Sequence, residues 1–139
     1  MIKHLMRIFV LSSILLQTIA TLNRYCPFGT AFDIYVTNRL PTNSPTLLVH
    51  CASKDDDLGN HTLTNNQEFH FGFCDNSVST LFFCTLWWDK KRISFDAFKE
   101  TILKTTCYKN QICYWAAFSD GIYYSDDHPP QELTKMYDW

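Results

Sequence analysis

Two segments of this chain each join a run of β-forming residues to one cysteine. The first is HCASKDDDLGNHTL, His50 to Leu63, and the second is TLFFCTLWW, Thr80 to Trp88. The three consecutive aspartates of the first segment favour a solvated loop, because ionised carboxylates are rarely buried without a partner. Two strand-like runs separated by a polar loop are typical of a β-rich domain.

Further short runs of β-forming residues continue along the chain. The runs expected to form strands are 32–37, 46–53, 68–74, 80–88, 112–118 and 122–125. The segment 93–98 fits either a strand or a short helix, and Asp120-Gly121 favours a tight hairpin turn. The segment Asp55 to Asn60 is a turn signal that should interrupt secondary structure. We therefore expect an all-β fold, a small antiparallel β-sandwich of seven or eight strands with disulfides.

The N-terminal residues have the three parts of a secretory signal peptide. Lys3 and Arg7 are basic, an apolar stretch runs from Ile8 to about Leu16, and Thr18-Ile19-Ala20 offers small residues for cleavage. A membrane anchor is the less favoured alternative, because the apolar stretch is shorter than the roughly 20 residues of a spanning helix. We predict a signal peptide at 1–20 and one secreted domain at 21–139, with no stable membrane insertion.

The charge of the expected mature domain argues against nucleic-acid binding. Removing Lys3 and Arg7 from the 12 basic residues leaves 10 against 14 acidic ones, a formal charge near −4. Affinity for nucleic acid comes mainly from clustered basic side chains, and the only basic run is Lys90-Lys91-Arg92. We predict no nucleic-acid partner.

Six cysteines in an exported chain indicate a disulfide framework. They are Cys26, Cys51, Cys74, Cys84, Cys107 and Cys113. Six cysteines allow 15 connectivities, and spacing alone does not choose among them. Cys107 and Cys113 are close enough to staple a loop, whereas Cys51 and Cys84 lie in strand-like runs that are neighbours or face each other across two sheets. Those two pairs would leave the remaining two cysteines as the third.

No enzyme motif accompanies these features. The histidines His50, His61 and His70 are not placed together by any pattern, so paired-histidine phosphodiester chemistry is not predicted. A G-x-S-x-G motif is absent, and an even cysteine count argues against a free nucleophilic thiol. The triplet Asp55-Asp56-Asp57 lacks the alternating spacing of a calcium loop. We predict no catalytic residue, no metal and no cofactor.

Two features point to the surface of the domain. Asn60-His61-Thr62 is an N-glycosylation sequon in a polar segment, so Asn60 is a candidate glycosylation site, occupied or unoccupied. Trp87 and Trp88 are adjacent in a strand-like run and must face opposite ways. One of them is expected in the core, and the other either packs under a loop or is exposed to a partner.

With these residues in view, the chain resembles the plant self-incompatibility S-protein homologue family, from about Phe32 to Trp139. The matching elements are Asn38-Arg39-Leu40, His50-Cys51-x-Ser53, Asp55-Asp56-Asp57-Leu58-Gly59, Thr80-Leu81-Phe82-x-Cys84 with Trp88, Cys107, Cys113-x-Trp115, Asp120-Gly121-x-Tyr123 and Trp139. The resemblance implies a β-sandwich, secretion to the apoplast and disulfides Cys51–Cys84 and Cys107–Cys113. Cys26 and Cys74 lie outside the family's four-cysteine pattern and are expected to form a third bridge.

The resemblance also implies a function. Founding members of the family are pistil-borne ligands recognised by pollen, so we expect a secreted, non-enzymatic recognition or signalling protein with a cell-surface protein receptor. By matching position, the candidate partner-contact loop is Asp55, Asp56, Asp57, Leu58 and Gly59. The alternative is a secreted defence protein that acts on membranes or carbohydrate through an exposed tryptophan. The oligomeric state is not predicted.

Overall fold

The computed structural model describes residues 2–7, 24–75, 79–101, 104–105 and 107–139. Residues 2–7 are helical, and ten strands form the rest of the regular structure in the described residues. The strands are β1 (Thr30–Asn38), β2 (Leu47–Ala52), β3 (Asp57–Leu63), β4 (Glu68–Asp75), β5 (Leu81–Trp88), β6 (Lys91–Thr101), β7 (Lys104–Thr105), β8 (Ile112–Phe118), β9 (Gly121–Ser125) and β10 (Thr134–Tyr137). The all-β prediction is confirmed, and β3, β7 and β10 are the strands that the sequence did not predict.

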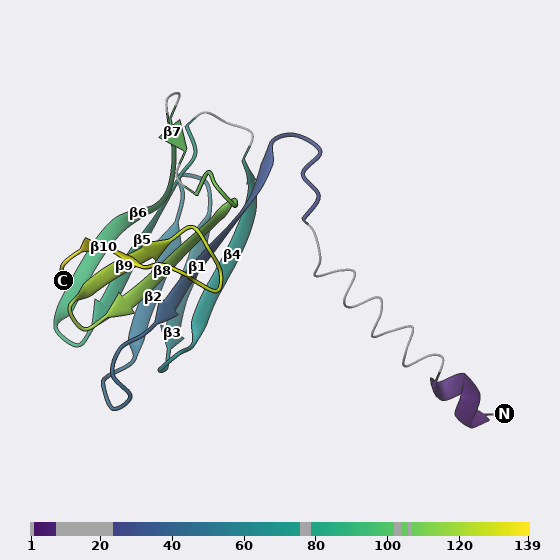
Figure 1. Ribbon diagram of the computed structural model, residues 1–139, viewed down its shortest axis with the longest axis horizontal. Helices are drawn as coiled ribbons and strands as arrows, with labels where there is room; N and C mark the ends of the chain where they lie inside the picture. Colours follow the sequence, from purple (N-terminus) through teal and green to yellow (C-terminus); the bar gives the residue numbers. More distant parts are fainter. Residues whose placement is uncertain (1, 8–23, 76–78, 102–103, 106) are drawn as a thin grey trace.

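The strands form two five-stranded sheets that pack face to face (Figure 1). The first sheet has the order β10-β9-β8-β1-β4, and the second has the order β3-β2-β5-β6-β7. All strand pairs in the described residues are antiparallel except β1 with β8, which is parallel. Parallel neighbours need a long connection. Here the chain builds the whole second sheet, and β4 of the first, between β1 and β8.

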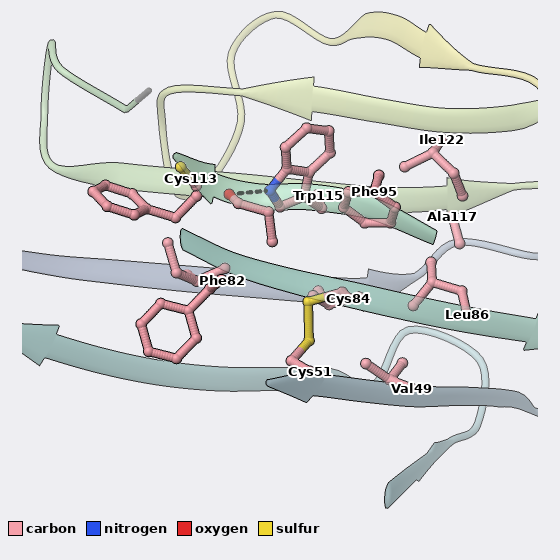
Figure 2. Close-up of a cluster of buried hydrophobic side chains, with 14 of the residues drawn as sticks. Val49, Cys51, Phe82, Cys84, Leu86, Phe95, Cys113, Trp115, Ala117 and Ile122 are labelled. Atoms are coloured by element: carbon pink, nitrogen blue, oxygen red, sulfur yellow. Dashed lines mark hydrogen bonds between the residues drawn. A yellow bond between two sulfur atoms is a disulfide. The ribbon is translucent and has the colours of Figure 1, made fainter. Parts of the chain in front are cut away.

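Every second side chain along a strand points inward, and these side chains fill the space between the sheets. The inward positions of the central strands are at most 5% exposed, namely Phe32, Ile34 and Val36 in β1, Leu47, Val49 and Cys51 in β2, and Phe82, Cys84 and Leu86 in β5. Figure 2 shows part of this core, in which the Trp115 indole nitrogen donates a 3.0 Å hydrogen bond to the Ala97 carbonyl oxygen. A buried indole thus keeps a partner for its N–H group.

A β-bulge in β6 explains the ambiguous pattern at 93–98. Phe82 of β5 pairs with Phe98, but the next residue, Phe83, pairs with Asp96, so Ala97 is an extra residue on β6. The bulge turns both Ala97 and Phe98 into the core, where each is fully buried, together with Phe95 three residues before Phe98. Inward residues three apart are a helical spacing, and the bulge produces that spacing in a strand.

Three disulfides fasten the fold, and no described cysteine is free: Cys26–Cys74, Cys51–Cys84 and Cys107–Cys113. These are the pairs to which the sequence and the resemblance pointed. Cys51 and Cys84 lie directly opposite each other on β2 and β5, with Cα atoms 4.1 Å apart and both side chains fully buried. This bridge joins neighbouring strands of one sheet rather than facing sheets, and Figure 2 shows it inside the core.

The predicted cleavage site at Thr18-Ile19-Ala20 lies outside the described residues, as does most of the predicted signal peptide at 1–20. Among the helical residues that the structure describes, none belongs to a segment long and apolar enough to cross a membrane.

Candidate recognition surface

The acidic segment between β2 and β3 begins with a tight turn. The Ser53 backbone N–H donates a 2.8 Å hydrogen bond to the Asp56 carbonyl oxygen, and the Asp56 N–H donates to the Ser53 hydroxyl oxygen at 3.1 Å. The turn is thus stabilised by hydrogen bonds among its own backbone groups and the side chain of Ser53. They also leave the carboxylates of Asp55 and Asp56 exposed to solvent.

Asp57 is held in place by its neighbours. Its carboxylate accepts a 2.9 Å hydrogen bond from the Gly59 N–H and lies 2.6 Å from the His50 imidazole Nε2. The hydrogen bond from the Gly59 backbone, with a further contribution from His50, lowers the pKa of the Asp57 carboxyl below its usual value. Asp57 therefore organises the start of β3.

The prediction that Asp55 to Asn60 interrupts secondary structure was wrong for its last four residues, because β3 begins at Asp57. Gly59 adopts φ +76°, a conformation that glycine reaches without steric cost, and the register against β2 shifts at this place. Leu58 meanwhile packs against the hydrophobic core. Of the five predicted contact residues, Asp57, Leu58 and Gly59 therefore serve the fold.

Asp55 and Asp56 differ from these three, because their side chains make no hydrogen bond or ion pair with any residue that the structure describes. They lie beside a groove of about 760 Å³ at the start of β5. Its lining includes Lys54 and Phe73, and Leu81 and Phe83 contribute apolar surface that is 38% and 39% exposed. Exposed apolar side chains next to free carboxylates form a surface suited to a partner that is both apolar and basic.

Comparison with known proteins identifies the family of this chain. Residues 33–139 match the model of the family described as plant self-incompatibility protein S1. The chain belongs to this family. S-protein homolog 29 of Arabidopsis thaliana is 32% identical over 99% of this chain and 98% of its own length, and S-protein homolog 5 of the same plant is 40% identical over 68% and 71%. Self-incompatibility protein S1 of Papaver rhoeas is 30% identical over 84% and 82%.

The two adjacent tryptophans of this S1 family member face opposite ways. Trp88 packs against the core and against Trp139, with ring centroids 5.7 Å apart. Trp87 lies on the outer face of the second sheet, with the Arg92 guanidinium 5.8 Å from its ring centroid. The expected division into one core and one surface tryptophan thus holds, and Trp87 is the outer one.

A histidine cluster on the outer face of the first sheet was missed by the sequence reasoning. His70 and His128 both stack on Tyr35, with ring centroids 4.4 and 4.0 Å from the tyrosine ring. Each imidazole Nε2 pairs with a carboxylate, Asp33 at 2.8 Å and Glu68 at 2.9 Å. Burial, with the nearby carboxylates of Asp33 and Glu68, raises the pKa of Tyr35 above its ordinary value.

This cluster does not reproduce paired-histidine catalysis. Such chemistry needs two imidazoles that converge on one reacting group, whereas here a tyrosine ring is stacked with both His70 and His128 and each Nε2 already has a carboxylate partner. His50 and His61 lie on other faces of the domain, one bound to Asp57 and the other to the Leu58 carbonyl oxygen. No group of metal-binding residues occurs in the part of the chain that the structure describes.

Proposed function

We propose that this S1 family member is a secreted, non-enzymatic recognition protein that binds a cell-surface protein receptor. Residues 1–20 direct export and are removed, and residues 21–139 form the ligand. The receptor contacts the acidic end of the second sheet, at Asp55 and Asp56 and at the apolar side chains of Leu81 and Phe83. This assignment narrows the predicted contact loop to its first two residues and adds two residues of β5.

The observation that carries the proposal is the contrast between Asp55 and Asp56 and their neighbours. Asp57, Leu58 and Gly59 are occupied by contacts within the fold, whereas the first two carboxylates have no such role in the described structure. A charged group that does not stabilise the domain is available to steer and hold a positively charged partner. The groove beside it offers the apolar contacts that supply most binding energy.

The names of the relatives support the same class of function. The Papaver rhoeas relative is called a self-incompatibility protein, and the Arabidopsis thaliana relatives are called S-protein homologs. A recognition role also agrees with a rigid disulfide-linked scaffold that presents short turns between strands. Export supplies the oxidising compartment in which the three disulfides form.

The test is saturable binding of the labelled, secreted protein to plant protoplasts, with and without prior trypsin treatment of the cells. We expect saturable binding that trypsin abolishes, and an affinity about tenfold lower for the double variant Asp55→Asn/Asp56→Asn, because two interfacial charges are lost. Asp89→Asn is the matched control. Asp89 is an exposed aspartate in the β5–β6 turn, at the opposite end of β5.

Three results would contradict the proposal. Wild-type-like binding by the double variant would remove the acidic turn from the contact surface, and an equal loss with Asp89→Asn would show only a general charge effect. Release of dye from liposomes by the purified protein would favour the alternative of a membrane-active defence protein. Peptide mapping of the secreted protein reports in parallel whether the chain begins at residue 21.

A further inference from the structure

The sequon Asn60-His61-Thr62 is presented on the outer face of the second sheet. Asn60 lies in the edge strand β3 opposite His50 of β2, and its exposed side chain makes no hydrogen bond within the described part of the chain. Thr62 shares this face, because it is two residues along the strand. His61 points the other way and stacks on Phe69, with ring centroids 3.9 Å apart. The asparagine and the threonine of the sequon are therefore both on the open face.

Asn60 is aligned by strand register with polar residues on the neighbouring strands, and together they form a row across the sheet. The row consists of Asn60, His50, Thr85 and Ser94, on β3, β2, β5 and β6. On β5 this row is flanked by two outward aromatic side chains, Phe83 on one side and Trp87 on the other. Thr85 is on the outer face, yet it is only 6% exposed. The row is thus polar along its length and has one aromatic side chain on either side of it at β5.

This polar row has the chemistry and the length to contact a carbohydrate. Sugar rings offer apolar C–H faces, which pack on aromatic side chains, and hydroxyl groups, which bond to polar ones. Neighbouring strands are about 4.8 Å apart, so β5 lies only about 10 Å from β3, within the span of the sugars nearest the attachment point. We propose that Asn60 carries an N-linked oligosaccharide whose proximal sugars lie along this polar row, against Trp87.

The modification is an ordinary group transfer in the secretory pathway, so this inference rests on the proposed export. The donor is an oligosaccharide linked to a lipid diphosphate. A bond forms between the Asn60 side-chain nitrogen and C1 of the first N-acetylglucosamine, and the bond from C1 to the diphosphate oxygen breaks. The amide nitrogen loses one proton, and the lipid diphosphate leaves with the bonding electrons.

The seated glycan has two consequences for the molecule. It covers an apolar strip and part of an edge strand, the two kinds of surface through which β-proteins associate unspecifically. It also leaves the acidic end of the sheet open. Asp55 and Asp56 follow the end of β2 at Ala52, which pairs with Phe83 one row away from the polar row. A receptor can therefore reach the acidic turn while the middle of the sheet is covered.

The test compares Thr62→Ser, which keeps the sequon, with Thr62→Ala, which removes it, both secreted from a eukaryotic host. We expect a glycopeptide at Asn60 in the wild type and in Thr62→Ser, and an unmodified peptide in Thr62→Ala. Hydroxyl-radical labelling of Trp87 should be about threefold lower in the glycosylated proteins, because one face of the indole is covered. Tyr108, 80% exposed and outside the polar row, is the internal control and should be labelled equally.

The outcomes separate this inference from the proposed function. A protein that reaches the medium with Asn60 unmodified overturns the glycan and leaves the receptor proposal intact. A glycan at Asn60 with equal labelling of Trp87 in both variants overturns the proposed contact of the sugars with the polar row. A chain that stays inside the cell and unmodified overturns export and glycan together.

Discussion

The two sheets of this domain bury their inner faces in the same way, but their outer faces differ. On the first sheet, the outward side chains Asp33, Tyr35, Glu68 and His70 bond or stack with one another and with His128. On the second sheet, the outward side chains of β5 are largely apolar, and Leu81 and Phe83 remain well exposed. The side chains of the first outer face thus contact one another, whereas the second outer face presents surface that suits a partner or a covalent glycan.

The comparison teaches that alternation decides which side chains face outward but says little about what they do there. Both sheets obey the period of two, except at bulges such as the one in β6. Only the identity of the neighbours across the strands separates a closed polar network from an open apolar strip. The search for a recognition site in a small sandwich therefore begins with cross-strand neighbours rather than with single residues.

The largest expected difference between the sheets concerns their disulfides. Replacing Cys51 and Cys84 together by serine removes a fully buried bridge inside the second sheet and should lower the free energy of unfolding by about 2 to 5 kcal/mol. Replacing Cys26 and Cys74 together removes a bridge at the edge of the first sheet, where Cys74 is exposed, and should cost less. Urea denaturation of both double variants measures the two losses, and equal losses would show that burial of the bridge is unimportant.

Two glycines provide the next comparison, one from each sheet. A Cβ at Gly121, at the start of β9, would overlap the Tyr137 carbonyl oxygen of β10, so Gly121→Ala should cost about 3 kcal/mol or more. Gly59 in β3 has open space around it, so Gly59→Ala meets only the penalty of φ +76°, about 1 to 2 kcal/mol. Thermal unfolding followed by circular dichroism ranks the two variants. A greater loss for Gly59→Ala would contradict this ranking.

The smallest expected effects are changes in stability with pH, one at alkaline pH for the first sheet and one at acid pH for the second. In the first sheet, burial and a hydrogen bond to Asp126 raise the pKa of Tyr124, so its contribution to stability is complete below about pH 10 and is lost as the pH rises further. In the second sheet, the lowered pKa of Asp57 gives a contribution that is present above about pH 4 and lost as the pH falls through the folded-state value.

Urea midpoints measured from pH 2 to pH 11 test both contributions. Tyr124→Phe should flatten the alkaline limb of the stability profile and leave the acid limb unchanged. Asp57→Asn should destabilise the protein at pH 7 and converge with the wild type at low pH, where the wild-type carboxyl is protonated. A constant difference between Asp57→Asn and the wild type at every pH would assign the role of Asp57 to packing instead of charge.

Much of the fold was predictable, because strands and cysteines leave local signals. The runs at 32–37, 68–74 and 112–118 alternate or carry β-forming residues, and each became a strand. The strands β7 and β10 were not predictable, since two or four residues are too few to show a period. The segment 93–98 was ambiguous because a bulge in a strand imitates helical spacing.

The candidate site was predictable only in outline. The run of three aspartates and the sequon are visible in the sequence. Which of the aspartates serves the fold depends on His50 and on the backbone of Gly59, because both bond to Asp57. His128 gave no signal, because its partners Tyr35 and Glu68 are more than 50 residues away in the chain. Long-range pairing of this kind has no local pattern.

The amino-acid pattern alone therefore predicted the class of fold, the presence of disulfides and the resemblance to a family, because periodicity, cysteine count and motif order are properties of the chain. The tertiary structure decided which outward residues meet. It placed Asn60, His50, Thr85 and Ser94 in one row, because strand register brings together residues that are distant in sequence. It also gave Asp57 its partners while Asp55 and Asp56 have none among the residues that the structure describes.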